Sequence, residues 1–320
     1  MNKIVILIII CCSLSCSNKT KSGKFKLPVI AFLDAFQDET IEEAKKGFFD
    51  ALKNHGYSEE NHTIKVIYRN AQGDIPTLTQ GADYFVSEKV TLIATNATLA
   101  TITAAQKTKD IPIFMMVAPS PQMAQLTDEA GNPPKNLFGV YENLSYIDTS
   151  VVLIKQVMPK VKTIGTVYNQ AEPQSRAALD EITNQCKGLG LILISLPVNN
   201  SSETQLVLSS LLNKDIDVFF AMPDNTIFAS FETIVKSCND KGVPIFTSEA
   251  GLVKRGAIAA YGADIYQWGY QSGAQAAQFL IQGTTKGLQP QLVQTRKRIY
   301  NPAVAEKFNI EFSSPFVSLQ

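Results

Sequence analysis

Short apolar, β-rich segments alternate with amphipathic segments of helical spacing through most of this 320-residue chain. In the first half, the predicted strands are 27–36, 62–70, 90–96 and 111–117, and the predicted helices are 39–57, 74–89 and 97–109. In the second half, the predicted strands are 161–170, 191–198, 217–223 and 243–249, and the predicted helices are 173–190, 202–214 and 225–242. This alternation predicts an α/β fold, a parallel sheet with helices on both faces.

The alternation occurs twice at the scale of a domain. "TLIATNATLATITAAQKTKDIPIFM" aligns with "VFFAMPDNTIFASFETIVKSCNDKGVPIFT" in its order of strand, polar loop, helix and "[IV]PIF" strand. Pro112 and Pro244 stand 132 residues apart, far beyond solenoid periods. We therefore expect two similar doubly wound lobes with strand order 2-1-3-4-5 and right-handed crossovers, although all βαβ units share some of this pattern.

The first residues have the composition of an export signal. One early cation, an apolar run of about nine residues and a group of small residues precede Cys16, and such a run is too short to span a bilayer. "SLS" before this cysteine resembles the lipobox of bacterial lipoproteins, although Ser13 stands where Leu is usual. We expect a signal peptide at 1–15, lipidation of Cys16 and a tether at 16–26. Simple cleavage near Ser15 and an uncleaved anchor are the alternatives.

Two cysteines remain in the predicted folded part. An exported chain with Cys186 and Cys238 invites a disulfide. In the predicted topology, however, Cys186 lies on the first helix of lobe two and Cys238 on the third, so the sheet separates them. We predict two free, buried thiols.

Composition and motifs argue against several classes of function. Lys and Arg number 29, as do Asp and Glu, so no basic surface points to nucleic acid. The sequence contains no Gly-rich phosphate loop, no His/Cys metal spacing and no nucleophile elbow. We expect no cofactor, no metal and no enzyme, although paired carboxylates near strand ends leave acid–base catalysis open.

Ligands of open parallel sheets bind beyond the carboxyl ends of the strands. The loops at those ends are rich in amides, hydroxyls and carboxylates, and they lie at 33–39, 94–98, 117–122, 168–175, 222–226 and 247–251. Asn96, Ser175, Asp224 and Asn225 in these loops are also good helix N-caps, which is the alternative for each alone. Two such rims facing each other form a polar cleft that suits a small zwitterion.

Within that cleft, aromatic walls and one carboxylate have predicted roles. Phe36, Phe138 and Tyr141 are candidates for the walls. Asp224 follows the third strand of lobe two, opposite the Asn96 loop, and we expect it to accept a hydrogen bond from a ligand ammonium. The alternative is that Asp224 only caps the helix that follows it.

The chain resembles the substrate-binding lipoproteins of ABC importers in the tryptophan- and tyrosine-type group. The resemblance covers about residues 27–315 and rests on "KTIGTVYNQAEPQS", "FFAMPDNTIFASFETIV", "VPIFTSEAGLVKRGAIAAYGADIYQWGYQSGAQAAQFLIQG" and "IYNPAVAEKFNIEF". It implies the bilobal type I periplasmic binding protein fold, an extracytoplasmic lipid-anchored monomer, and a small ligand passed to a permease and ATPase. An aromatic amino acid is the leading ligand.

The resemblance also implies a set of ligand-binding positions. Carried over by motif, these are Thr95, Asn96, Thr98, Asn169, Glu172, Ser175, Asp224, Asn225 and Glu249. The first rim, "DAFQDETIEEA", is more acidic than the family pattern, and "APSPQ" replaces an acidic–Pro pair, so both changes bear on the ligand.

In such proteins the chain crosses between the lobes three times. We place the crossings near Glu142, near Gly262 and at 289–291, which gives lobe one as 27–141 plus 263–290 and lobe two as 142–262 plus 291–320. Closure is then a hinge motion at those segments. An extracytoplasmic sensor for a membrane receptor would need the same cleft, and a cleft enzyme is a third, less favoured reading.

Overall fold

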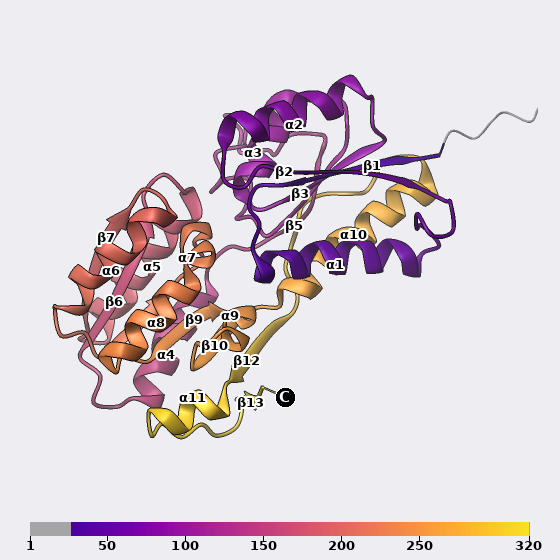
Figure 1. The fold of residues 1–320 in the computed structure, drawn as a ribbon. Coiled ribbons are helices and arrows are strands. Elements are labelled where there is room, and N and C mark those ends of the chain that lie inside the picture. The colour runs from indigo at the N-terminus through magenta and orange to yellow at the C-terminus, as the bar shows by residue number, and fades with distance from the viewer. Residues whose placement is uncertain (1–26, 320) are drawn as a thin grey trace, which may run out of the picture.

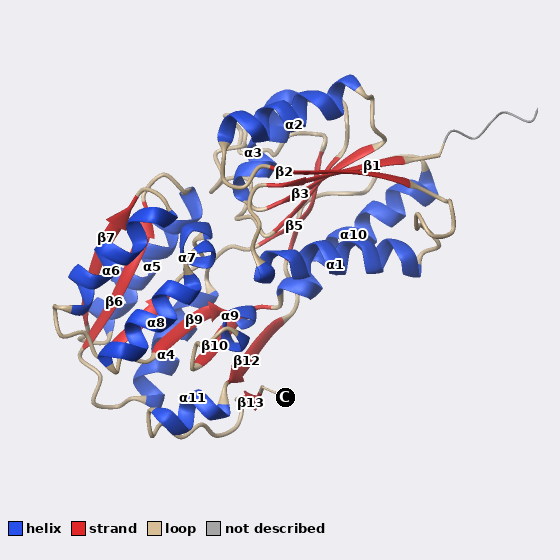
Figure 2. Ribbon diagram, viewed as in Figure 1, coloured by secondary structure: helices blue, strands red, loops and turns tan. Residues whose placement is uncertain are grey.

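The structure is a computed structural model that describes residues 27–319. It consists of two α/β lobes, and each lobe is a twisted sheet with helices on both faces (Figures 1 and 2). The predicted signal peptide, the lipidation at Cys16 and the tether lie outside the described residues.

Lobe one contains a six-stranded sheet among the described residues, in the order β11-β5-β4-β3-β1-β2. Its strands are β1 (Val29–Asp34), β2 (Lys65–Asn70), β3 (Leu92–Asn96), β4 (Ile113–Met116), β5 (Leu137–Tyr141) and β11 (Gln291–Leu292). Its helices are α1 (Glu39–Asn54), α2 (Ile75–Ser87), α3 (Thr98–Lys107) and α10 (Ile265–Gln282). Helices α1 and α10 lie side by side on one face, and α2 and α3 cover the other (Figure 1).

Lobe two contains a seven-stranded sheet among the described residues, in the order β13-β12-β10-β9-β8-β6-β7. Its strands are β6 (Thr163–Asn169), β7 (Ile192–Val198), β8 (Val218–Ala221), β9 (Ile245–Glu249), β10 (Ala259–Ala263), β12 (Arg296–Tyr300) and β13 (Val317–Ser318). Its helices are α4 (Tyr146–Val157), α5 (Pro173–Gly188), the 3₁₀ turn η1 (Ser201–Glu203), α6 (Thr204–Leu212), α7 (Asn225–Ala229), α8 (Phe231–Lys241), α9 (Ala250–Lys254) and α11 (Pro302–Lys307).

The predicted fold class and strand order are confirmed. The first five strands of each lobe pair in the order 2-1-3-4-5, and all four of these pairings are parallel in both lobes. Because every carboxyl end of a parallel strand lies at the same sheet edge, this order gathers the polar loops of each lobe into one rim.

Two details differ from the sequence prediction. The single helix predicted at 225–242 is two helices, because the chain bends at Ser230, whose hydroxyl lies 3.0 Å from that of Thr204 and donates to the Ser201 carbonyl. The third crossing follows β11 rather than lying at 289–291, since Gln291 and Leu292 still pair with β5 of lobe one.

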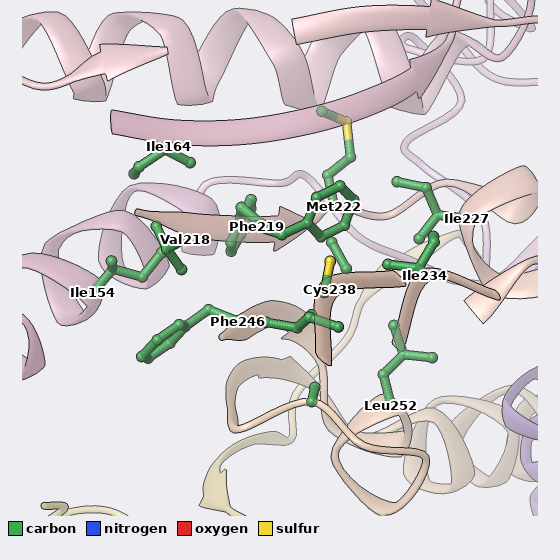
Figure 3. Close-up of a cluster of buried hydrophobic side chains, with 14 of the residues drawn as sticks. Ile154, Ile164, Val218, Phe219, Met222, Ile227, Ile234, Cys238, Phe246 and Leu252 are labelled. Carbon is green, nitrogen blue, oxygen red and sulfur yellow. The ribbon is translucent and has the colours of Figure 1, made fainter. Parts of the chain in front are cut away.

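Apolar residues fill both faces of each sheet. In lobe two they cluster around β8, where Figure 3 shows Phe219, Met222 and Cys238 together. Cys186 and Cys238 are both free and buried, as predicted. Burial in apolar surroundings raises the pKa of Cys186 to about 11 and that of Cys238 to about 12, so both thiols stay protonated at neutral pH.

Candidate ligand site between the lobes

Two adjacent pockets lie between the lobes, at the carboxyl ends of the strands. The outer pocket has a volume of about 590 Å³ and takes Phe36, Ile75 and Leu99 from lobe one and Asn169, Glu172 and Asn200 from lobe two, among others. The inner pocket has a volume of about 30 Å³, and its lining includes Thr98 and Trp268 from lobe one and Gln174, Asp224, Asn225 and Glu249 from lobe two. Such a volume admits a group about the size of one water molecule.

Two acceptor oxygens of the inner pocket are buried and lack a donor. Gln174 Oε1 and Glu249 Oε2 have no hydrogen-bond partner among residues 27–319. The orientation of the Gln174 amide is fixed, because its Nε2 donates to Glu172 and its oxygen therefore points the other way. Since buried polar atoms are almost always paired, two unpaired acceptors in one pocket mark a place for a donor-rich group.

Glu249 is the last residue of β9, and its carboxyl group is held by one neighbour. Tyr146 at the start of α4 donates its hydroxyl to Glu249 Oε1 at 3.2 Å, which leaves Oε2 free. Burial raises the pKa of Glu249 well above its usual value, and the Glu142 charge adds to this, whereas the Tyr146 hydrogen bond opposes it. The nearby Arg296 does not compensate Glu249, because its guanidinium pairs with Glu142 at 2.7 Å.

The first turn of α3 adds backbone donors at the same place. Ala97 occupies its N-cap position with a φ of 73° and has no side chain that can cap the helix. The first N–H groups of a helix lack intrahelical acceptors, and the helix dipole favours an anion there. Thr98 lines the inner pocket and Leu99 the outer pocket, so this turn lies where the two pockets meet.

Asp224 has the geometry of a helix cap. Its Oδ1 accepts the N–H of Ile227 at 3.0 Å and caps α7, and its Oδ2 accepts the N–H of Asn169 at 2.6 Å and the hydroxyl of Ser175 at 2.5 Å. Both oxygens are thus occupied within lobe two, although the residue lines the inner pocket. The capping alternative accounts for these contacts, and, unlike Glu249, Asp224 has no oxygen without a donor that would require one from a ligand.

Glu172 separates the two pockets. Its Oε2 accepts the backbone N–H of Asn225 at 3.1 Å and the Asn225 Nδ2 at 2.9 Å, and it also accepts the Gln174 amide. Burial, together with the nearby Asp224 charge, raises the pKa of Glu172 to about 8. These bonds join the start of α5 to the start of α7 and hold Gln174 in place.

The predicted site residues divide into two groups. Those that line a pocket are Phe36, Thr98, Asn169, Glu172, Asp224, Asn225 and Glu249. Those that line neither pocket are Thr95, Asn96, Ser175 and Tyr141.

The residues of the second group support the rims from behind. Thr95 lies 3.0 Å from the Thr101 hydroxyl, and Asn96 donates to the buried Asp34 at 2.7 Å. Tyr141 packs against the apolar cluster on the α2 and α3 face of lobe one and lines neither pocket.

Several pocket residues were missed from the sequence, among them Gln174, Tyr146 and Trp268 of the inner pocket. Gln174 lies in the quoted loop "YNQAEPQS" but resembles an ordinary residue of a helix start. Tyr146 and Trp268 belong to helices that follow chain crossings, where no strand-end argument applies. The one available signal was that Trp268 is the only tryptophan of the chain.

A ligand pocket between two doubly wound lobes, built from strand ends of both, defines the class of bilobal solute-binding proteins. The chain belongs to the ABC transporter substrate binding protein family, whose model matches residues 27–317. It is 36% identical over 264 residues to a tyrosine-binding protein of Clostridioides difficile (strain R20291), which covers 82% of this chain and 75% of that protein. The prediction of an ABC transporter solute-binding protein is therefore confirmed.

Solved structures agree with this assignment. A conserved domain protein from Vibrio cholerae superposes with a TM-score of 0.85 at 28% identity over 92% of this chain and 99% of that one. An ABC domain from Streptococcus pneumonia in complex with L-Trp gives 0.82 at 25% identity over 90% and 97%. A ligand-free, open substrate-binding protein with adhesive properties from Clostridium difficile gives 0.68 at 27% identity over 92% and 100%.

The last two structures are similar in identity to this chain but differ in how well they superpose. A change of angle between lobes lowers a whole-chain superposition even where each lobe matches. The lobe arrangement described here is therefore more like that of the L-Trp complex than that of the open protein.

The family consists of binding proteins that act outside the cytoplasm and deliver small ligands to a permease, rather than of enzymes. Within residues 27–319, no group of three or more His, Cys, Asp or Glu side chains has a metal-binding arrangement. None of the helices described there is long and apolar enough to cross a membrane.

Proposed function

We propose that this protein binds a free amino acid whose ammonium group enters the inner pocket. The observation that carries the proposal is the pair of buried, unpaired acceptors, Gln174 Oε1 and Glu249 Oε2, in a cavity of about 30 Å³. An ammonium group is about the size of a water molecule and has three donors and no acceptor. One acceptor is a carboxyl group without a cation, so a cationic ligand group also compensates its charge.

The rest of the ligand follows from the surroundings of the inner pocket. The uncapped first turn of α3, at Thr98 and Leu99, supports a carboxylate beside the ammonium. The outer pocket then takes the side chain, with Phe36 and Leu99 on one wall and the amides of Asn169 and Asn200 opposite. A ring with a polar end suits such walls, and L-tyrosine is our first candidate, which the tyrosine-binding relative also supports.

Titration calorimetry with L-tyrosine and two truncated analogues tests this proposal. Tyramine lacks the carboxylate, and 3-(4-hydroxyphenyl)propanoate lacks the ammonium. We expect each analogue to bind at least about tenfold more weakly, because each forfeits a charge-assisted hydrogen bond of about 1.5–3 kcal/mol. Equal affinity of the deaminated analogue and L-tyrosine would exclude an ammonium site. Mass spectrometry of small molecules released from freshly purified protein identifies any other ligand.

We also propose that Cys16 carries the lipid that tethers the protein to the membrane, with the lobes hinged at the three chain crossings. The sequence before this cysteine supports a lipoprotein signal. Cys16→Ser should release the protein from the membrane fraction of a lipoprotein-processing host. Wild-type protein that is already soluble in that host would contradict the proposal.

A further inference from the structure

The acidic first rim, which the ligand pockets do not explain, contains a carboxylate that reaches the other lobe. Asp38 precedes α1, and its Oδ1 caps this helix by accepting the N–H groups of Thr40 at 2.9 Å and Ile41 at 3.1 Å. Its Oδ2 is directed at lobe two and accepts Nη1 of Arg255 at 2.7 Å. Asp38 therefore has one oxygen for its own helix and one for the partner lobe.

Arg255 joins the two lobes through its planar guanidinium. Besides Asp38, its Nη1 donates to the Thr40 hydroxyl at 3.0 Å, both on lobe one. Its other nitrogens donate to Glu232 at 2.8 and 3.0 Å and to the Phe228 carbonyl at 2.9 Å, all on lobe two. The side chain of Arg255 is 10% exposed and that of Asp38 is 3% exposed, so solvent screens the pair little.

The backbone of lobe two at Gly251 also comes close to the Thr40 side chain of lobe one at this point. A Cβ at Gly251, the second residue of α9, would lie 2.4 Å from Thr40 Cγ2, so only glycine allows this approach. Ile41 of α1 is 1% exposed and belongs to the apolar cluster of lobe two. The first turn of α1 is thus docked on lobe two by charge, by shape and by apolar burial.

We propose that Asp38 and Arg255 form an interlobe latch that stabilises the closed lobes and so sets the affinity and the release rate of the ligand without touching it. On opening, neither residue is left without a partner, because Asp38 still caps α1 and Arg255 still pairs with Glu232. Opening therefore breaks only the contacts between the lobes. Because no charge is left unpaired, the latch can open and close reversibly. If a ligand binds only the closed state, the free energy by which the latch stabilises that state increases the affinity of the ligand.

Asp38→Asn tests the latch, because asparagine is an equally good N-cap but carries no charge. Glu39→Gln is the matched control, since it removes the neighbouring exposed charge from the same segment. For Asp38→Asn we expect the Kd of L-tyrosine to rise about tenfold, which corresponds to 1.4 kcal/mol, mainly through faster dissociation. If the ligand-free wild type is mostly closed, small-angle scattering of the ligand-free variant should show a larger radius of gyration instead. The control should match wild type in both measurements.

The Kd measurement rests on the amino-acid site proposed above, whereas the scattering measurement uses ligand-free protein and does not. If L-tyrosine does not bind wild type, the proposed function fails, and a larger radius of gyration in Asp38→Asn than in wild type still supports the latch. If the ligand-free protein is mostly open, the change appears in Kd; if it is mostly closed, it appears in scattering. Unchanged Kd and unchanged radius in a folded Asp38→Asn variant would overturn the latch. Gly251→Ala, which forces Thr40 away, should shift both quantities in the same direction as Asp38→Asn.

Discussion

Replacing Glu249 with glutamine tests the central contact of the proposed site. The change keeps the size of the side chain and leaves an acceptor for the Tyr146 hydroxyl. It removes the one ionisable acceptor of the inner pocket that has a free oxygen, as judged over residues 27–319. In place of that oxygen it can present an amide NH₂, a donor facing the donors of a ligand ammonium.

The expected magnitude follows from the burial of this contact. A hydrogen bond to a charged group contributes about 1.5–3 kcal/mol, and about 1.4 kcal/mol is a factor of ten in Kd. Glu249→Gln should therefore weaken L-tyrosine binding by roughly 10- to 100-fold. The ligand-free variant should be at least as stable as wild type at pH 8, because it no longer buries an unpaired acid. A merely structural role would lower stability and affinity together.

The pH dependence gives a second signature. Burial raises the pKa of Glu249 in the empty pocket, whereas an ammonium ligand favours the carboxylate and so lowers that pKa on binding. Below the raised pKa, binding then releases up to one proton, so the affinity should rise with pH there by up to about tenfold per unit. The glutamine variant should lack this slope.

Calorimetry at pH 6, 7 and 8, in buffers of different ionisation enthalpy, measures both the Kd and the number of protons released. Asp224→Asn serves as the comparison, since it changes an acid of the same pocket whose oxygens are both occupied. A pH-independent Kd in wild type, together with unchanged affinity in Glu249→Gln, would refute the assignment of the ammonium to this residue.

Three further predictions concern the groups around the site. Asp224→Asn should lower the free energy of unfolding by about 1–3 kcal/mol, because the new amide NH₂ group faces the Asn169 N–H, which is also a donor. Chemical denaturation measures this loss. The same variant should change the Kd of L-tyrosine less than about threefold. The folded-state pKa of Glu172 is raised to about 8, so its contribution to stability is largest at acid pH and is lost as pH rises through about 8. Glu172→Gln should therefore make the fall in stability between about pH 5 and 8 less steep than in wild type, and a slope equal to that of wild type would contradict this. Thiol titration of protein lacking residues 1–16 should give two thiols after unfolding and slow reaction before it, whereas a count of zero would mean a disulfide.

The sheet order was predictable because it depends on local rules. Strand and helix periods, short connections and right-handed crossovers act over a few tens of residues, and they left one topology for each lobe. The break between α7 and α8 was not predictable in this way. It depends on the contact of Ser230 with Thr204, 26 residues away, and nothing in the helical period of 225–242 marks it.

The position of the candidate pockets was easier to predict from the sequence than the roles of the residues in them. Seven of the eleven proposed ligand positions line the pockets, because the strand-end rule locates rims. The rule cannot say which way an amide faces or which oxygen is occupied. Gln174 presents an acceptor only because Glu172 holds its NH₂ group, and Asp38 meets Arg255 across 217 residues of chain.

The acids of the two rims show why partner geometry decides function here. Asp38, Glu172 and Asp224 all follow strand ends and would be equivalent by position, yet each is engaged by donors of the protein. Glu249 keeps an oxygen without a donor among the described residues. An unpaired buried acid lowers the stability of the empty protein, and proteins break such local rules mainly at functional sites. A cation that binds there regains that free energy only when the lobes are closed around it, so the same unpaired oxygen couples recognition to closure.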